Sequence, residues 1–274
     1  MNRFIYFIIS SLFIFAIIFP VDGYSRKTIQ SPLSKTDQAV DFIIGNTMFF
    51  AFHEAGHMLI SEFGLPVLGN EEDAADSAAV FFMLEAGDDR FQKMLAHAAK
   101  GWQLVAGYKN GDDDVDLWDA HRLSEQRAYG IVCMMVGSNR KKFKRIADEY
   151  ELPDERRDEC EEEYQLVSDS WHKLLSPYKA SKSHETHFTI DYRKPESRSL
   201  SRYVKLFRDA DVLEVIEKAY ATPYKLENGI KITADECGED NAYWSADDRE
   251  ITICYELAEY YSKLFAYSLA DRSD

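Results

Sequence analysis

The sequence is poor in positive charge: 32 Lys and Arg stand against 48 Asp and Glu, a formal net charge of −16. A protein that binds nucleic-acid phosphates needs a basic face, so no nucleic-acid partner is expected. Cysteine is also scarce, with four in 274 residues, too few for a small disulfide-stapled scaffold. The apolar fraction of 46% excludes global disorder, and the length fits one large domain or two small ones.

A transmembrane-length apolar run is missing at the start of the chain, where the run from Phe4 to Phe19 is only about 16 residues long. A spanning helix needs roughly 20. With Arg3 before this run and Val21-Asp22-Gly23 after it, residues 1–23 are typical of a secretory signal peptide. We therefore expect residues 24–274 to be periplasmic or secreted, with no stable membrane span after cleavage. The alternative is an uncleaved single anchor.

The four cysteines form no CxxC pair and no Cys/His zinc knuckle, so a thiolate metal site is not expected. Export to an oxidising compartment favours disulfides, and four cysteines allow three pairings. We favour Cys133 with Cys160, on neighbouring helical segments, and Cys237 with Cys254, which flank an expected hairpin. The alternative is buried free thiols.

Hydrophobic periodicity predicts an α+β protein that is mostly helical, with a small C-terminal antiparallel sheet. Helices are expected over 34–63, 71–86, 91–108, 119–136, 141–150, 154–175 and 204–220, with a turn at 110–114. The period changes to two at 230–234, 242–244 and 251–255, where strands are expected. The resulting parts are a helical part (24–176), a connector with one β-like stretch at 187–192 (177–202), and a helix plus C-terminal hairpin (203–274).

The first long helix contains the motif His53-Glu54-Ala55-Gly56-His57. A step of four residues puts both imidazoles on one helix face, where they suit Zn²⁺, and Glu54 lies where it can deprotonate a zinc-bound water. The structural alternative is a helix with two hydrogen-bonded core histidines.

A catalytic zinc needs a third protein ligand. Glu72 follows the motif at the start of the next helix, and Asp76 stands one turn further on. We expect Glu72 to bind the metal and Asp76 to accept a hydrogen bond from a ligating histidine. Glu71 is the alternative ligand, and a solvated acidic helix start is the alternative without a metal.

HExxH followed by a Glu-x-x-x-Asp helix resembles the gluzincin metallopeptidases, the thermolysin-like group. HEAGH with Glu-x-x-Ala-Asp-x-x-Ala also resembles the zinc peptidases that cleave phage-type repressors. More closely, the chain resembles an uncharacterised bacterial family of metallopeptidases through its phrases HEAGH, LPVLGNEEDAAD, HRLSEQRAYGIVCMMVG and CGEDNAYWSADDREITICYEL. The resemblance covers nearly the whole of residues 24–274. It implies a zincin-like active-site helix, one Zn²⁺ per chain, and a peptidase of peptide or protein substrates, more an endopeptidase than an exopeptidase.

In gluzincins an Asn-Ala-aromatic edge strand lies over the zinc and pairs with the substrate. Asn241, Ala242 and Tyr243 match that phrase and are therefore implied as substrate-binding residues. In gluzincins this strand precedes the HExxH helix, whereas here it follows, so the order resembles a circular permutation. We expect the hairpin at 241–255 to lie against the first helix; the alternative is an ordinary hairpin.

Zincins often add a donor that stabilises the oxyanion of the tetrahedral intermediate. His121 and Tyr255 are the candidates we take as catalytic, with Tyr243 and Arg127 as further ones, while a capped helix start is the structural alternative at His121. The sequence thus predicts an exported zinc peptidase. The runner-up is a catalytically silent zinc-containing binding module of the cell envelope.

Overall fold

The computed structural model describes residues 35–109, 119–181, 184 and 186–270. The expected signal peptide (1–23) and the expected turn at 110–114 lie outside these residues. Among the helices of this part, none has the length and apolar character needed to cross a membrane.

Helix α1 (Lys35–Phe63) is the element around which the others pack. All its residues from Phe42 to Ile60 are buried except Phe50 and His57, which are partly exposed. A helix that is apolar all round must be enclosed, and here α2 (Glu71–Glu85) and α3 (Asp89–Lys109) pack on α1 from one direction. The sheet and α8 (Val212–Tyr220) lie on its other side, and α9 (Tyr255–Ala270) packs against it as well.

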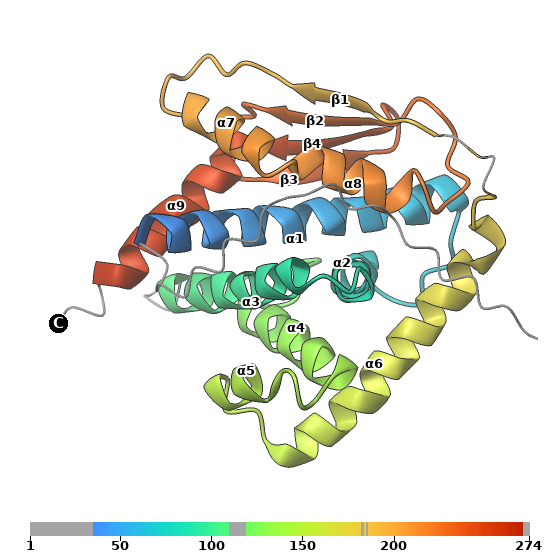
Figure 1. Ribbon diagram of the computed structural model, residues 1–274, viewed down its shortest axis with the longest axis vertical. Helices are drawn as coiled ribbons and strands as arrows, with labels where there is room; N and C mark the ends of the chain where they lie inside the picture. The colour runs from blue at the N-terminus through green and yellow to red at the C-terminus, as the bar shows by residue number, and fades with distance from the viewer. Residues whose placement is uncertain (1–34, 110–118, 182–183, 185, 271–274) are drawn as a thin grey trace, which may run out of the picture. The chain divides into compact units, whose positions relative to one another are not determined.

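The helices between residues 124 and 178 extend the side of α1 that carries α2 and α3 (Figure 1). Helix α4 (Ser124–Ser138) packs on α3 and on α6 (Asp154–Leu175). Short helices α5 (Lys144–Glu149) and η1 (Ser176–Tyr178) lie next to α4 and α6, respectively. Both predicted disulfides are present: Cys133–Cys160 joins α4 to α6, and Cys237–Cys254 joins the segment after β2 to the end of β4.

The sheet has four strands in the order β1-β2-β4-β3: β1 (Thr189–Tyr192), β2 (Lys231–Asp235), β4 (Glu250–Cys254) and β3 (Ala242–Ser245). Strands β1, β2 and β4 are parallel, and only the edge strand β3 is antiparallel to its neighbour. The predicted α+β, mostly helical class is confirmed, but the prediction of an antiparallel sheet is wrong. Parallel pairing follows from the long crossover through α7 (Ser201–Asp209) and α8, which returns the chain beside β1 in the same direction.

Several elements also differ from those expected. The connector at 177–202 contributes β1 to the sheet, and the helix expected from residue 119 begins at Ser124. The helix expected over 204–220 is divided into α7 and α8, because Asp211 adopts a left-handed conformation (φ 51°) that no α-helix continues. Helix α9 has no counterpart among the predicted elements.

The hairpin of β3 and β4 lies against α1, as expected, although the two are far apart in the chain. An ion pair fixes its turn: Arg249 donates from Nε to Glu62 Oε1 (2.8 Å) and from Nη2 to Oε2 (2.7 Å) near the end of α1. The free edge of β3 is thereby held beside the helix that carries His53 and His57.

Candidate metal centre

His53, His57 and Glu72 converge on one point. The two histidine Nε2 atoms are 3.2 Å apart, and Glu72 Oε2 lies 3.1 Å from that of His53 and 3.3 Å from that of His57. His53 is buried and His57 half-buried. One donor atom from each of the three residues lies within 4.8 Å of the others. The structure thus brings together the three residues predicted as metal ligands.

Close approach of α2 to α1 makes this convergence sterically feasible. A Cβ atom at Gly56 would lie 3.1 Å from both Ala75 Cα and Ala78 Cβ, so glycine at this position lets the helices come together. Asn70 caps α2 by accepting a hydrogen bond from the Glu72 backbone N–H (3.0 Å). Glu72 consequently stands in the first turn of a helix whose start is fixed beside the two histidines.

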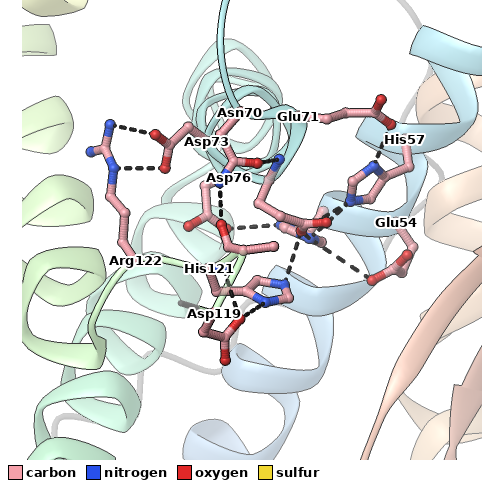
Figure 2. A network of polar contacts seen from close by, with 12 residues as sticks. Glu54, His57, Asn70, Glu71, Asp73, Asp76, Asp119, His121 and Arg122 are labelled. Carbon is pink, nitrogen blue, oxygen red and sulfur yellow. Dashed lines mark hydrogen bonds and ion pairs between the residues drawn. The ribbon is translucent and has the colours of Figure 1, made fainter. Parts of the chain in front are cut away.

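A carboxylate contacts the other ring nitrogen of each histidine. His53 Nδ1 lies 2.8 Å from Asp76 Oδ1. Figure 2 shows Glu71 beside His57, whose Nδ1 lies 2.8 Å from Glu71 Oε1. An Nδ1–H that donates to a carboxylate leaves the Nε2 lone pair available for a metal. Asp76 therefore occupies the place expected of it, whereas Glu71, the alternative ligand, is the carboxylate partner of His57.

The charge of the centre is set by these contacts. Burial opposes protonation of His53, but hydrogen bonds with Asp76 and Glu72 outweigh it and raise its pKa to about 9. The hydrogen bond with His53 lowers the pKa of Glu72 to about 2, against the opposing effect of burial. The centre thus stabilises positive charge next to the ionised carboxylate of Glu72. A divalent cation can supply this positive charge in place of a proton.

Glu54 lies on the same helix and is 7% exposed. Its Oε1 is 4.0 Å from His53 Nε2, and its carboxylate accepts a hydrogen bond from the backbone N–H of Trp244 in β3. Burial raises the pKa of Glu54, while His53 and His57 act in the opposite direction. A carboxylate with a raised pKa beside a metal position is suited to general base chemistry.

His121 reaches the centre from the segment before α4 (Figure 2). Its Nε2 lies 2.9 Å from Glu72 Oε2, and its Nδ1 lies 3.1 Å from Asp119 Oδ1. Asp119 also accepts a hydrogen bond from the His121 backbone N–H (2.9 Å). This hydrogen bond forms a turn, so the segment is not part of α4. Asp119 was not among the predicted site residues, although the short Asp-x-His spacing is the signal that could have found it.

Tyr255, predicted as catalytic, does not join this group. It is fully buried, its hydroxyl donates to the carbonyl of Arg193 (2.9 Å), and its ring packs on Phe207 of α7. The hydroxyl is therefore engaged elsewhere. The prediction is corrected, because Tyr255 begins α9 and turns toward α7.

Asn241, Ala242 and Tyr243 lie at the edge of the sheet. The Cys254 N–H donates to the Asn241 carbonyl (3.1 Å), so in the antiparallel ladder the polar backbone groups of Ala242 and Trp244 point away from β4. The outward N–H of Ala242 donates to Asn241 Oδ1 (2.9 Å), and that of Trp244 donates to Glu54, so this edge faces the HExxH motif. Ala242 is buried, and Tyr243 is 41% exposed.

Two imidazole nitrogens and one carboxylate oxygen are a donor set that fits Zn²⁺ at a catalytic site, where three protein ligands leave one position open. One further group in the described chain has metal-like spacing, Cys237, Cys254 and Glu256. Its two sulfur atoms are bonded to each other, so they are not available as thiolates. The His53, His57 and Glu72 group is therefore the candidate centre.

Neither a curated protein nor a solved structure shows a significant match to the chain. A family model described as "Putative metallopeptidase" does match it, over residues 16–175 and 192–273. These ranges cover most of the chain and include every residue of the candidate centre. The chain belongs to this metallopeptidase family.

Proposed function

We propose that the protein is an exported zinc-dependent peptidase of gluzincin type, with zinc held by His53, His57 and Glu72. The observation that carries this proposal is the convergence of the two Nε2 atoms on Glu72 Oε2, with both Nδ1 atoms held by carboxylates. Membership of a metallopeptidase family supports it. The two disulfides are compatible with an oxidising compartment outside the cytoplasm.

Glu54 is the general base of the proposed reaction. A bound Zn²⁺ would supply Lewis-acid polarisation of the scissile carbonyl and lower the pKa of a water molecule. Glu54 accepts a proton from the attacking water and returns it to the leaving amine as the peptide bond breaks. Its burial supports both steps, since burial raises the pKa of the carboxyl toward the working range of the reaction.

In its imidazolium form, with both ring nitrogens protonated, His121 is proposed to donate a hydrogen bond from Nε2–H to the carbonyl oxygen as negative charge develops there. Asp119 holds its Nδ1, so Nε2 is directed at the centre, where it lies 2.9 Å from Glu72 Oε2. Its side chain is 43% exposed, which leaves it accessible to a substrate from solvent.

The edge of β3 is proposed to bind the substrate backbone. The outward C=O groups of Ala242 and Trp244 can accept hydrogen bonds from an extended peptide, flanked by Asn241 and by the exposed ring of Tyr243. The outward N–H of Ala242 can pair with the peptide once it leaves Asn241 Oδ1, to which it donates at 2.9 Å. Strand pairing needs no free terminus of the substrate, so it favours an endopeptidase.

Replacement of Glu54 by Gln tests this function. The amide cannot accept a proton, so Glu54→Gln should retain one zinc per chain and lose cleavage of an unstructured protein substrate, by about 10²-fold or more. Wild type and variant are compared for metal content and for peptide release. Equal cleavage by both would contradict the role of Glu54. Zinc without cleavage in wild type as well would instead favour a zinc-containing binding module of the cell envelope.

A further inference from the structure

Arg127 of α4 makes a bidentate pair with Asp76 of α2 in the interior. Its Nε donates to Asp76 Oδ2 (2.8 Å) and its Nη2 to Asp76 Oδ1 (2.6 Å), and its side chain is 4% exposed. Two parallel hydrogen bonds fix the plane of a carboxylate as well as its position. Asp76 is therefore held in one orientation.

Aromatic rings fix the guanidinium in turn. The Arg127 Cζ atom lies 3.8 Å from the ring centroid of Trp102 in α3 and 5.9 Å from that of Phe49 in α1. A guanidinium packed this closely on an indole is stabilised by the ring electrons and has little freedom to tilt. Arg127 thus meets four helices at one point: its own, and those of Trp102, Asp76 and Phe49.

The same Asp76 oxygen, Oδ1, contacts His53 Nδ1 at 2.8 Å. The contacts therefore run without a gap from Trp102 through Arg127 and Asp76 to His53, whose Nε2 faces Glu72. In the described chain no hydrogen bond or ion pair joins Arg127 to Glu72 or His57. Its position behind Asp76 does not fit the oxyanion role considered from the sequence.

We propose that Arg127 is a positioning residue of the metal centre, which acts through Asp76 to set the ring orientation of His53. This inference rests on the proposed metal site. It differs from a purely structural role, in which the buried ion pair would hold α2 and α4 together without affecting the metal.

The test is the zinc affinity of Arg127→Lys, measured by titrating metal-free protein with Zn²⁺ against a chromophoric chelator. Lysine keeps the positive charge but lacks the fork, so it cannot fix the carboxylate plane. We expect affinity to fall by about 10- to 100-fold, as for other partners of metal-bound histidines. The matched control is Arg157→Lys: Arg157 is also mostly enclosed and pairs with Asp148 and the Leu152 carbonyl, away from the centre. It should leave zinc affinity unchanged.

A double-mutant cycle with Asp76→Asn separates positioning from structure. If Arg127 acts through Asp76, Arg127→Lys should weaken zinc binding little or not at all in the Asp76→Asn background. Trp102→Leu provides a second variant if Arg127→Lys does not fold; it should weaken binding several-fold, again only when Asp76 is present.

Three outcomes overturn the inference. The first outcome is an Arg127→Lys variant that binds zinc as tightly as wild type. The second is an equal loss of zinc affinity from Arg127→Lys in the wild-type and Asp76→Asn backgrounds. Either would leave Arg127 with a structural role only, and the peptidase proposal would stand. Absence of zinc binding by wild type would overturn the proposed function and this inference together. Zinc binding without peptidase activity would overturn the proposed function alone.

Discussion

Glu72 provides the single oxygen atom on which both motif histidines converge, whereas Glu71 contacts only the far nitrogen of His57. Glu72→Ala should therefore abolish tight zinc binding, since it removes one of three ligands. Glu71→Ala should weaken binding by only about 10- to 100-fold, the usual effect of losing a histidine's carboxylate partner. Chelator competition on both variants measures the difference. The reverse ranking would mean that Glu71 is the ligand.

His53 should make the stability of the metal-free protein depend on pH. Its pKa in the folded state is raised from 6.5 to about 9, so the folded protein holds this proton more tightly than the unfolded chain does. The contribution of His53 to the free energy of unfolding is therefore complete below pH 6.5 and is lost as the pH rises through 9. The full loss corresponds to about 3 kcal/mol. Urea unfolding in a chelator at pH 6.5 and at pH 9.5 measures it, with His53→Gln as the control. An equal change in both proteins would rule out His53 as the source.

At the residue scale, the sequence predicts those side chains whose spacing along one helix determines their geometry. His53, Glu54 and His57 are of this kind, and Glu72 with Asp76 follows the same rule on α2. The contacts of Glu71, Asp119 and Arg127 depend instead on how two helices or a loop approach each other. Tyr255 was misassigned for the same reason, since a strand position does not reveal which neighbour its hydroxyl meets.

Gly56 and Gly130 allow the packing of α1 on α2 to be tested with matched substitutions. A Cβ at Gly56 would crowd Ala75 and Ala78, whereas one at Gly130 of α4 would meet no atom within 4 Å. Gly130→Ala should stabilise the protein by up to about 1 kcal/mol through helix propensity. In Gly56→Ala the same gain should be offset by overpacking, which costs about 1–3 kcal/mol. Because overpacking displaces α2, this variant should also bind zinc more weakly.

Urea unfolding and chelator competition on these two variants measure both effects. Stabilisation by Gly56→Ala with unchanged zinc affinity would show that the helices do not need this close approach.

At the scale of elements, most helices are visible in the sequence because their buried residues recur at helical intervals. Helix α9 carries the same signal in Leu257, Ala258, Tyr261 and Leu264, but it begins directly after β4 without a turn that would mark its start. The parallel pairing of β1 with β2 could not be predicted, because it depends on the path of the crossover rather than on either strand's residues.

For the whole molecule, the disulfides fix the two regions that flank α1. Cys133–Cys160 ties α4 to α6, and Cys237–Cys254 ties the two ends of the segment that contains β3. With a separation of 17 residues, the second should contribute about 3 kcal/mol in the chain-entropy model. Unfolding of the Cys237→Ser, Cys254→Ser double variant measures this, and non-reducing peptide mapping checks the pairing. An unchanged stability would mean that the Arg249–Glu62 ion pair and sheet packing fix the hairpin without the bond.

The most direct test of the central claim is the zinc content of the purified wild-type protein, measured beside His57→Ala by elemental analysis. The convergence of His53, His57 and Glu72 predicts one zinc per wild-type chain and a large loss in the variant, because two protein ligands do not retain the metal tightly. A folded wild-type protein without zinc that also fails to take it up, or a His57→Ala variant that retains a full equivalent, would contradict the account.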